Sequence, residues 1–376
     1  MVREFGAKSV TVKEAISLDE EILFMMPQPI FGFVLLFRAR EVEPFKEEQS
    51  CPRKVWFANQ MPAQNSCATL AMLNILLNLP ERVDIGEHLR QFKDFTNDFT
   101  PYARGEALSS FEFVKRIHNS FAKKMDMLQD DTHLAYKASR GHGASRRKSI
   151  DTINTVQSEE YFEDNAHHFI AFLPADGKVW KLDGMNAFPT NLGTIDDDQG
   201  RNWISIATHT MRNVMASGGD NEYSIVALCQ QPMTTLHLNM IQSKLALNLV
   251  HRHLNALTSE WSAFAASVEP SPTLLSVCGV SQEALNAATL DPEEEERIDR
   301  DAHNLAALLE RRENLISDLN EAQVKFYQAA DDIEKENIKA EERRWDYGPF
   351  IKRWLEMLAE NGHLEQNMDK FQERRR

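Results

Sequence analysis

A lone cysteine stands at the start of an apolar stretch, directly after a polar turn. Cys67 follows Asn65 and Ser66, either of which could cap a helix, and Pro62 lies just upstream. The apolar residues that follow have the spacing of one helix face: Leu70, Leu73, Leu76 and Leu77. The first N–H groups of a helix lack internal partners, so we expect them to lower the pKa of this thiol and make it a nucleophile. The alternative is a small buried hydrophobic residue, which describes most free cysteines.

A histidine and an aspartate flank a predicted β-hairpin. Residues 168–173 and 178–182 are apolar runs on either side of Asp176-Gly177, a dipeptide typical of a two-residue turn. That turn places Ile170 opposite Asp183, so His168 becomes the diagonal neighbour of Asp183 on the same face. The aspartate could then accept from one ring nitrogen of His168 and leave the other for a thiol, as in a catalytic triad. A buried histidine satisfied by a nearby aspartate is the alternative, and His167 points to the opposite face.

Several blocks of the sequence together resemble the ubiquitin C-terminal hydrolases, a family of cysteine deubiquitinases. The catalytic block of that family has a Gln followed by Asn-small-Cys-Ala/Gly-Thr, as in Gln60 and the run from Asn65 to Thr69. Its second block is matched by the run from His168 to Ala171, by Asp176-Gly177, by the run from Leu182 to Gly184 and by Phe188-Pro189. Further matches to the long, proteasome-associated type are Phe92-Lys93-Asp94-Phe95, Ala107-Leu108-Ser109 and the run from Ile117 to Ala122.

The resemblance implies a role for each matched residue. Cys67 would be the nucleophile, His168 the general acid and base, Asp183 the residue that orients His168, and Gln60 the oxyanion donor. Six residues separate Gln60 from Cys67, where the family usually has five. The family also usually has a strand before the segment matched by residues 5–10, and this chain begins after it.

The resemblance and the patterns together predict an α+β fold with an all-helical extension. The family has a papain-like, knotted fold, mainly an antiparallel sheet flanked by helices. We expect helices over residues 18–25, 67–77, 86–96 and 110–123, and strands over 32–37, 168–173, 178–182 and 223–229. Residues 1–240 would form the catalytic domain. Residues 241–376 would form a helical partner-binding domain, with one near-coiled-coil helix over about 297–343 and a short amphipathic helix near 345–358.

Composition and charge exclude several classes of function. The chain has 376 residues, 42% of them hydrophobic and 26% charged, which is typical of a soluble protein with a sizeable core. Its net charge of -15 argues against sequence-independent nucleic-acid binding. Residues 30–37 are apolar but too short to cross a bilayer, so we expect no membrane partner.

The cysteines suggest a reducing compartment. Cys51, Cys67, Cys229 and Cys278 form no CxxC pair, which argues against a zinc site and a disulfide framework. Together with the resemblance this predicts no cofactor or metal, and a location in the cytoplasm and nucleus.

Two further segments take their roles from the resemblance. The polar stretch 129–165 corresponds to the crossover loop that spans the active-site cleft of the family. The segment from Arg343 to Ile351 resembles the tail motif that binds an adaptor in the proteasome cap receptor or in chromatin regulators. Phe350, Trp354 and Met357 would form its helix-in-groove anchor.

The predicted function is therefore thiol-dependent hydrolysis of bonds after the C-terminal glycine of ubiquitin, with ubiquitin and its conjugates as partners. One alternative is a catalytically silent scaffold that binds ubiquitin and recruits partners through its tail. Another is a transglutaminase-like or papain-type thiol enzyme, which needs the same triad but would not explain the crossover segment or the tail.

Overall fold

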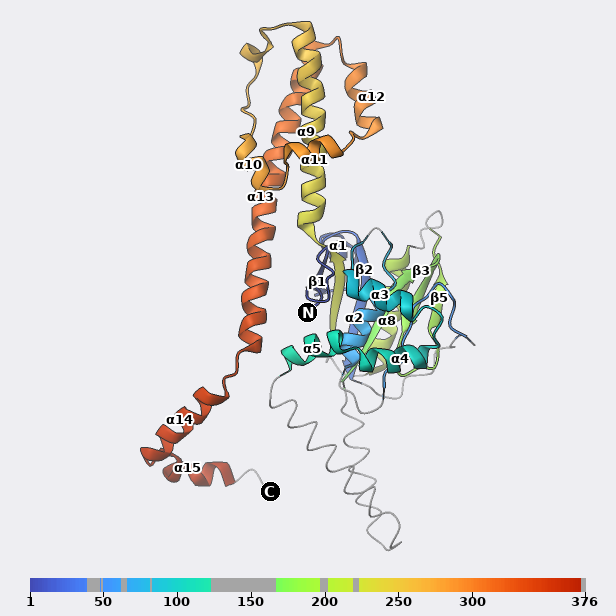
Figure 1. Ribbon diagram of the computed structural model, residues 1–376, viewed down its shortest axis with the longest axis vertical. Helices are drawn as coiled ribbons and strands as arrows, with labels where there is room; N and C mark the ends of the chain where they lie inside the picture. Colours follow the sequence, from blue (N-terminus) through green and yellow to red (C-terminus); the bar gives the residue numbers. More distant parts are fainter. Residues whose placement is uncertain are drawn as a thin grey trace, which may run out of the picture. The chain divides into compact units, whose positions relative to one another are not determined.

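The computed structural model describes residues 1–38, 48, 50–61, 66–81, 83–122, 167–196, 202–218 and 223–372. The predicted crossover segment 129–165 and the candidate cap Asn65 lie outside these residues. The first part of the chain mixes helices and strands (Figure 1). In chain order they are β1 (Val10–Glu14), α1 (Glu20–Phe24), β2 (Ile30–Arg38), α2 (Cys67–Leu76), α3 (Glu87–Phe95), α4 (Pro101–Ser110), α5 (Glu112–Phe121), β3 (His167–Ala175), β4 (Lys178–Leu182), β5 (Thr190–Thr194), α8 (Trp203–Gly218) and β6 (Tyr223–Gln230).

The strands form one six-stranded sheet in the order β1-β6-β2-β3-β4-β5, and each neighbouring pair is antiparallel. The β3–β4 hairpin closes through Asp176 and Gly177, whose φ angles of 51° and 70° are the positive values that a type I′ turn requires. Ala175 therefore pairs with Lys178, as predicted. The expected antiparallel sheet is confirmed, whereas the knotted path of the chain stays a prediction.

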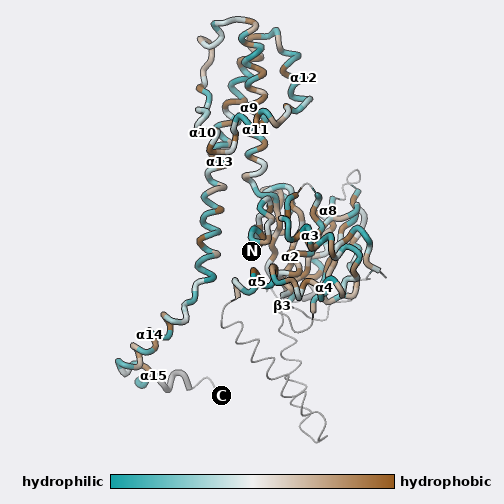
Figure 2. Tube along the Cα trace, viewed as in Figure 1, coloured by the Kyte–Doolittle hydropathy of each residue, from teal (hydrophilic) through white to brown (hydrophobic). Residues whose placement is uncertain are grey.

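Helices α2 and α8 cover opposite faces of this sheet. A Cβ on Gly32 would touch the Ile75 side chain of α2, whereas the ring of Phe33 lies 5.4 Å from that of Trp203 at the start of α8. Because neighbouring strand residues point to opposite faces, the two helices lie on either side of β2. The strands between them are strongly apolar (Figure 2). This burial on both faces agrees with the two-sided apolar pattern of β3.

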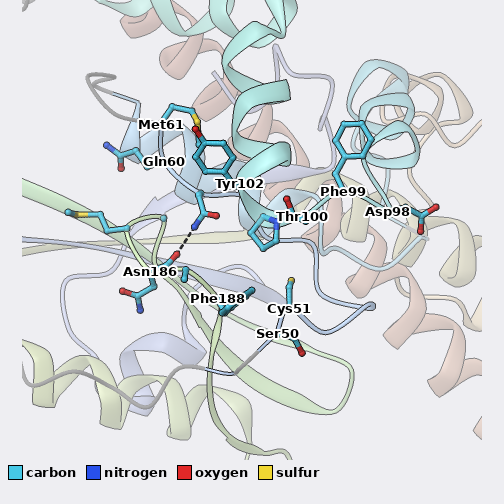
Figure 3. A pocket seen from close by; sticks show the side chains of 15 residues that line it. Ser50, Cys51, Gln60, Met61, Asp98, Phe99, Thr100, Tyr102, Asn186 and Phe188 are labelled. Atoms are coloured by element: carbon cyan, nitrogen blue, oxygen red, sulfur yellow. Dashed lines mark hydrogen bonds between the residues drawn. The ribbon is translucent and has the colours of Figure 1, made fainter.

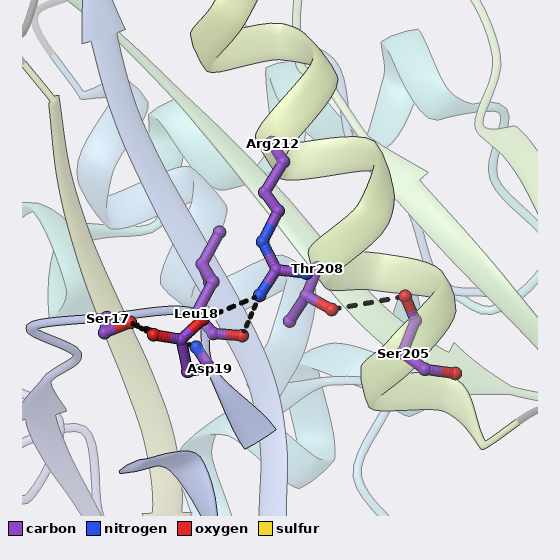
Figure 4. Close-up of polar contacts among 6 residues, drawn as sticks. All are labelled: Ser17, Leu18, Asp19, Ser205, Thr208 and Arg212. Atoms are coloured by element: carbon purple, nitrogen blue, oxygen red, sulfur yellow. Dashed lines mark hydrogen bonds and ion pairs between the residues drawn. The ribbon is translucent and has the colours of Figure 1, made fainter. Parts of the chain in front are cut away.

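Helix α8 is also attached to the segment that precedes α1 (Figure 4). One guanidinium nitrogen of Arg212 donates to the Leu18 carbonyl at 2.6 Å and lies 3.3 Å from an Asp19 carboxylate oxygen. The Ser17 hydroxyl donates to the other oxygen of the same carboxylate at 2.7 Å. These contacts join segments almost 200 positions apart, so they fix the segment before α1 against the middle of α8.

The remaining elements are helices. They are α9 (Pro232–Leu257), the 3₁₀ turn η2 (Trp261–Phe264), α10 (Pro272–Val277), α11 (Gln282–Ala287), α12 (Pro292–Arg300), α13 (Leu305–Arg344), α14 (Gly348–Glu360) and α15 (His363–Gln372). Residues between Met240 and Leu319 build a hydrophobic core of their own. The chain divides into two compact units: Met1–His118 with Arg147–Ile333, and Asn119–Arg146 with Glu334–Arg376. Among the described residues, no helix is both long and apolar enough to cross a membrane.

The sequence prediction of one helix over about 297–343 is wrong. The chain leaves helical conformation after α12, at Asp301, and α13 begins only at Leu305. The Asn304 side chain accepts a hydrogen bond from the Ala307 N–H at 3.2 Å, which caps the new helix. An acceptor side chain at that position therefore starts a second helix inside a continuous apolar pattern.

The predicted helix over 110–123 agrees with α5 to within two residues at each end. Helix α4 ends at Ser110, and α5 runs from Glu112 to Phe121. Thr100 caps α4 by accepting from the Ala103 N–H, and Pro101 occupies its first turn, two start signals that the sequence did carry. In the first part of the chain α4, α8, β1 and β5 were not predicted, whereas the predicted strands and helices there agree to within a few residues.

Candidate active site

Cys67 is the first residue of α2, as the sequence predicted. The leucine stripe that follows is buried, which fixes the helix on the sheet. Ser66 occupies the N-cap position, but its side chain makes no capping hydrogen bond. The Thr69 hydroxyl in the first turn lies 2.8 Å from Nδ1 of His118, so this end of α2 is also attached to α5. Cys67 itself is half-buried.

The surroundings of the Cys67 sulfur raise its pKa, which corrects the expectation of a lowered one. Burial disfavours the thiolate and is the largest effect, while backbone hydrogen bonds from Ala68, Cys67 and Phe169 favour it. The N–H groups at the helix start therefore act as expected, but they do not outweigh the loss of water. The hydrogen bond from Phe169 also places the sulfur beside β3, next to the residue that follows His168.

His168 and Asp183 form the hydrogen-bonded pair that the hairpin register predicted. Nε2 of His168 lies 2.7 Å from Oδ1 of Asp183, and both residues are less than a tenth exposed. Ala171 pairs with Leu182, so β3 and β4 have the register that makes the two residues diagonal neighbours. The ring of Phe37 packs edge-on against the His168 ring from β2. Asp183 and Phe37 therefore hold the imidazole ring in one orientation. Asp183 contacts Nε2, and Nδ1 is the other ring nitrogen.

Asp183 is held in its charged form. Burial raises its pKa, but the hydrogen bond to His168, the electrostatic interactions with His168 and Lys181 and the hydrogen bond from the Met185 N–H together bring it below the ordinary value. Nζ of Lys181 lies 3.6 Å from Oδ2, and the Met185 N–H donates to Oδ1 at 3.1 Å. Sequence reasoning missed Lys181, although a lysine two positions before Asp183 on the same strand face was a readable signal.

Gln60 lies beside the loop that follows Asp183. Its backbone N–H donates to the Gly184 carbonyl at 2.8 Å. A Cβ on Gly184 would come within 3.2 Å of the Gln60 backbone nitrogen and 2.6 Å of the Leu70 side chain, so only glycine fits between Gln60 and α2. Residues 62–65, which connect Gln60 to α2, lie outside the described residues. The position is suitable for an oxyanion donor, and that role stays a prediction.

These residues form an arrangement for nucleophilic catalysis. A thiol at a helix start lies next to the strand that carries His168, and a buried carboxylate holds Nε2 of that histidine. Because Asp183 occupies Nε2, Nδ1 is the nitrogen that could take the thiol proton. A nucleophile, a base and a group that orients the base are the three parts that such chemistry needs.

The comparisons with known proteins all point to one family. The model of "Ubiquitin carboxyl-terminal hydrolase, family 1" matches residues 1–216. "Ubiquitin carboxyl-terminal hydrolase isozyme L5" of Dictyostelium discoideum is 32% identical over 261 residues, which are 69% of this chain and 66% of that protein. "Ubiquitin carboxyl-terminal hydrolase ubh-4" of Caenorhabditis elegans is 28% identical over 249 residues, 65% of this chain and 68% of that protein. The chain thus spans about two thirds of the length of these two relatives.

The chain is also similar to a solved structure. The catalytic domain of Trichinella spiralis UCH37, bound to ubiquitin vinyl methyl ester, is 29% identical. The match covers 61% of this chain and 89% of that one, with a TM-score of 0.46.

Proposed function

This chain belongs to family 1 of the ubiquitin carboxyl-terminal hydrolases, which are cysteine-type ubiquitin hydrolases, and we propose that it cleaves bonds after the C-terminal glycine of ubiquitin through Cys67, His168 and Asp183. One observation carries the assignment of residues. It is the buried hydrogen bond between His168 and Asp183, on the strand whose Phe169 N–H contacts the Cys67 sulfur. Residues 1–240 supply the catalytic domain in this proposal.

The first half of the reaction forms a thioester. His168 takes the Cys67 proton on Nδ1 as the sulfur attacks the carbonyl carbon of the last glycine. The Cys67 backbone N–H and the Gln60 amide hold the negative oxygen. The bond to the leaving nitrogen then breaks, and His168 returns its proton to that amine.

The second half regenerates the thiol. His168 takes a proton from water, the hydroxide attacks the thioester carbon, and the carbon–sulfur bond breaks. Ubiquitin leaves with a free carboxylate, and Cys67 recovers its proton. Asp183 keeps its negative charge throughout, so it stabilises the imidazolium form of His168 in both halves.

Reaction with a ubiquitin that carries a C-terminal thiol-reactive group, read by intact mass, tests this proposal. We expect one adduct, which peptide mapping assigns to Cys67. Cys67→Ala should form no adduct yet still bind ubiquitin. Cys278→Ala, in the separate helical core, should react like the unaltered chain. An adduct that persists in Cys67→Ala would remove Cys67 from the mechanism.

The alternative is a catalytically silent scaffold that binds ubiquitin and recruits partners through its helical tail. The same probe separates the two, since a scaffold would bind ubiquitin without forming an adduct.

We further propose that residues 241–376 bind an adaptor of proteasomal or chromatin origin. The exposed aromatic residues Phe350 and Trp354 on α14 support this idea. We also propose that the protein is located in the cytoplasm and nucleus, because these reducing compartments keep a catalytic thiol free.

A further inference from the structure

A cavity of about 940 Å³ opens beside the candidate active site (Figure 3). Three separate segments line it: residues 59–61, 98–102 and 184–188, with residues 50–51 at one side. Two of these segments belong to the site already described, because the first contains Gln60 and the third begins directly after Asp183. The second segment is the loop that leads into α4. The cavity thus shares Gln60 with the candidate site and begins next to Asp183, whereas Cys67, His168 and Asp183 are not among its lining residues.

Hydrogen bonds join the three lining segments to one another. The Asn59 N–H donates to the Pro101 carbonyl at 3.0 Å, and the Gln60 N–H donates to the Gly184 carbonyl at 2.8 Å. The Asn59 side-chain amide also donates to the Asn186 carbonyl (Figure 3). The segment 59–61 is therefore bonded to both of its neighbours, and the cavity is formed before any ligand arrives.

A buried arginine supports the wall formed by residues 98–102. Arg104 is 4% exposed, and its guanidinium donates to four backbone carbonyls. They are those of Thr96 (3.0 Å), Asn97 (2.6 Å), Val55 (3.4 Å) and Phe57 (3.4 Å). Because one rigid guanidinium bonds to both segments, the loop before α4 keeps a fixed distance from the strand-like segment that leads to Gln60.

The lining suits an apolar side chain on a peptide backbone. Its side chains are mainly aromatic or apolar and include Phe99, Tyr102, Met185 and Phe188. The charged group among them, Asp98, is largely exposed and lies 3.6 Å from Arg53. The neutral amides of Asn59 and Asn186 add hydrogen-bonding groups near the Gln60 side. Apolar walls with a few fixed polar groups are typical of sites that bind a ligand by its shape.

The size of the cavity argues against the end of ubiquitin as its occupant. Two glycines have no side chains, so the groove that selects them must be narrow. A volume of about 940 Å³ can take several apolar side chains instead. We propose that this cavity binds the first residues of the polypeptide attached to ubiquitin, and that it prefers an apolar side chain directly after the scissile bond. The inference rests on the proposed hydrolase function.

Linear fusions of ubiquitin to a short peptide test the preference. The residue after the last glycine is Leu, Phe, Ser or Asp, and a ubiquitin ester with a small alcohol as leaving group measures activity without a peptide. We expect kcat/KM for the Leu and Phe fusions to exceed that for the Ser and Asp fusions by about tenfold, the size of one buried apolar side chain. Equal kcat/KM for all four fusions would overturn the preference.

Two variants locate that preference on the molecule. Tyr102→Ala shortens a partly exposed cavity residue. It should reduce the ratio of kcat/KM for the Leu fusion to kcat/KM for the Ser fusion toward one. Phe24→Ala removes an aromatic ring that is 81% exposed on α1, away from the lining, and should keep the ratio. If Tyr102→Ala slows the ester and all fusions equally, the cavity serves ubiquitin itself and the inference is wrong. A chain that cleaves neither ester nor fusions overturns the hydrolase function as well.

Discussion

At the scale of single residues, Asp183 sets both the orientation and the charge balance of the site. Its Oδ1 accepts from His168 and Met185, while its Oδ2 faces Lys181. A buried carboxylate without these partners would have a raised pKa, and here the pKa is lowered instead. The protein therefore keeps a negative charge next to His168, the residue that becomes an imidazolium in the proposed reaction.

Asp183→Asn should remove that charge while keeping the shape of the side chain. An amide can present its NH₂ group to Nε2 and stabilise the wrong tautomer, so we expect kcat/KM to fall by about 10⁴-fold, as in other triads. The KM for ubiquitin should change little, because Asp183 is buried and does not reach a bound protein. Steady-state kinetics with a ubiquitin ester measure kcat/KM and KM. A decrease in kcat/KM of less than tenfold would contradict the assigned role.

The same variant should change how stability depends on pH. Because the folded-state pKa of Asp183 lies below its ordinary value of 3.8, ionisation of Asp183 stabilises the fold above that value, and this stability is lost as pH falls through the folded-state pKa. The difference in the free energy of unfolding between the two proteins should therefore shrink from pH 7 to pH 3. Urea unfolding at both pH values measures it, and a constant difference would argue against a charged Asp183.

Cys67 should react as a protonated thiol when no substrate is bound. Burial raises its pKa above the ordinary value of 9.0, so its alkylation by iodoacetamide should keep increasing as pH rises beyond 9. Mass spectrometry of the Cys67 peptide at a series of pH values measures the rate, with free glutathione as the control. A plateau below pH 8 would instead indicate a thiolate paired with an imidazolium.

At the scale of elements, the hairpin was predictable and the loop packing was not. Asp176-Gly177 fixes the turn, the turn fixes the register, and the register brings His168 to Asp183. This chain of reasoning is local in sequence, so it needs no tertiary information. The leucine stripe of α2 is equally local. By contrast, the pKa of Cys67 depends on how deeply α2 is buried, which no local pattern reports.

The elements that sequence reasoning missed have weak local signals. β5 contains Asn191 and Gly193 and is short, so its residues have little β-propensity, and it forms because β4 offers an open edge. Helix α4 has a glycine at its centre and no apolar stripe. The cavity was unpredictable for a related reason: segments that lie tens of residues apart line it, and backbone hydrogen bonds between them give it its shape.

Gly105→Ala should show how closely α4 packs against the segment before Gln60. An added Cβ would lie 2.3 Å from the Asn59 carbonyl oxygen and 2.6 Å from the Met61 side chain. Alanine is favoured over glycine inside a helix by about 1 kcal/mol, but a clash with the backbone costs about 1–3 kcal/mol or more. We therefore expect a lower free energy of unfolding and a lower kcat, since the segment that carries Gln60 must move.

Gly177→Ala is the matched control for this substitution. Its Cβ would meet nothing within 4 Å, but its φ of 70° costs an alanine about 1 kcal/mol. It should lower stability and leave kcat unchanged. Thermal unfolding and kinetics of both variants separate the effects, and a Gly105→Ala protein with normal kcat would show that Asn59 can shift without moving Gln60.

At the scale of the whole molecule, the chain combines an α+β part and a helical part that pack around different cores. The sheet and α8 share one cluster of buried residues, whereas residues from Met240 onward form another. The proposed catalytic residues all precede the second cluster in the sequence, so our proposal leaves the helical part for another task. The strongest sign of that task is α14, a helix with large exposed apolar residues and no buried ones.

The exposed face of α14 should bind the groove of an adaptor. Phe350 and Trp354 are one turn apart and 69% and 53% exposed, and Met357 continues the same face. Large aromatic anchors typically contribute about 2 kcal/mol or more each, so Phe350→Ser with Trp354→Ser should weaken adaptor binding by at least about 100-fold. Lys352→Ser, on the same helix but outside the aromatic face, is the control and should bind normally.

Calorimetric titration of the full chain with purified adaptor domains, one from the proteasome cap receptor and one from a chromatin regulator, measures this affinity and identifies the partner class. Circular dichroism should show equal helix content in all variants, because neither aromatic residue is buried in the free chain. If the double variant binds an adaptor as tightly as the unaltered chain does, α14 is not the contact surface. If neither adaptor binds the unaltered chain, the proposed recruitment role is wrong while the hydrolase assignment stands, since that assignment depends on Cys67, His168 and Asp183 in the first part of the chain.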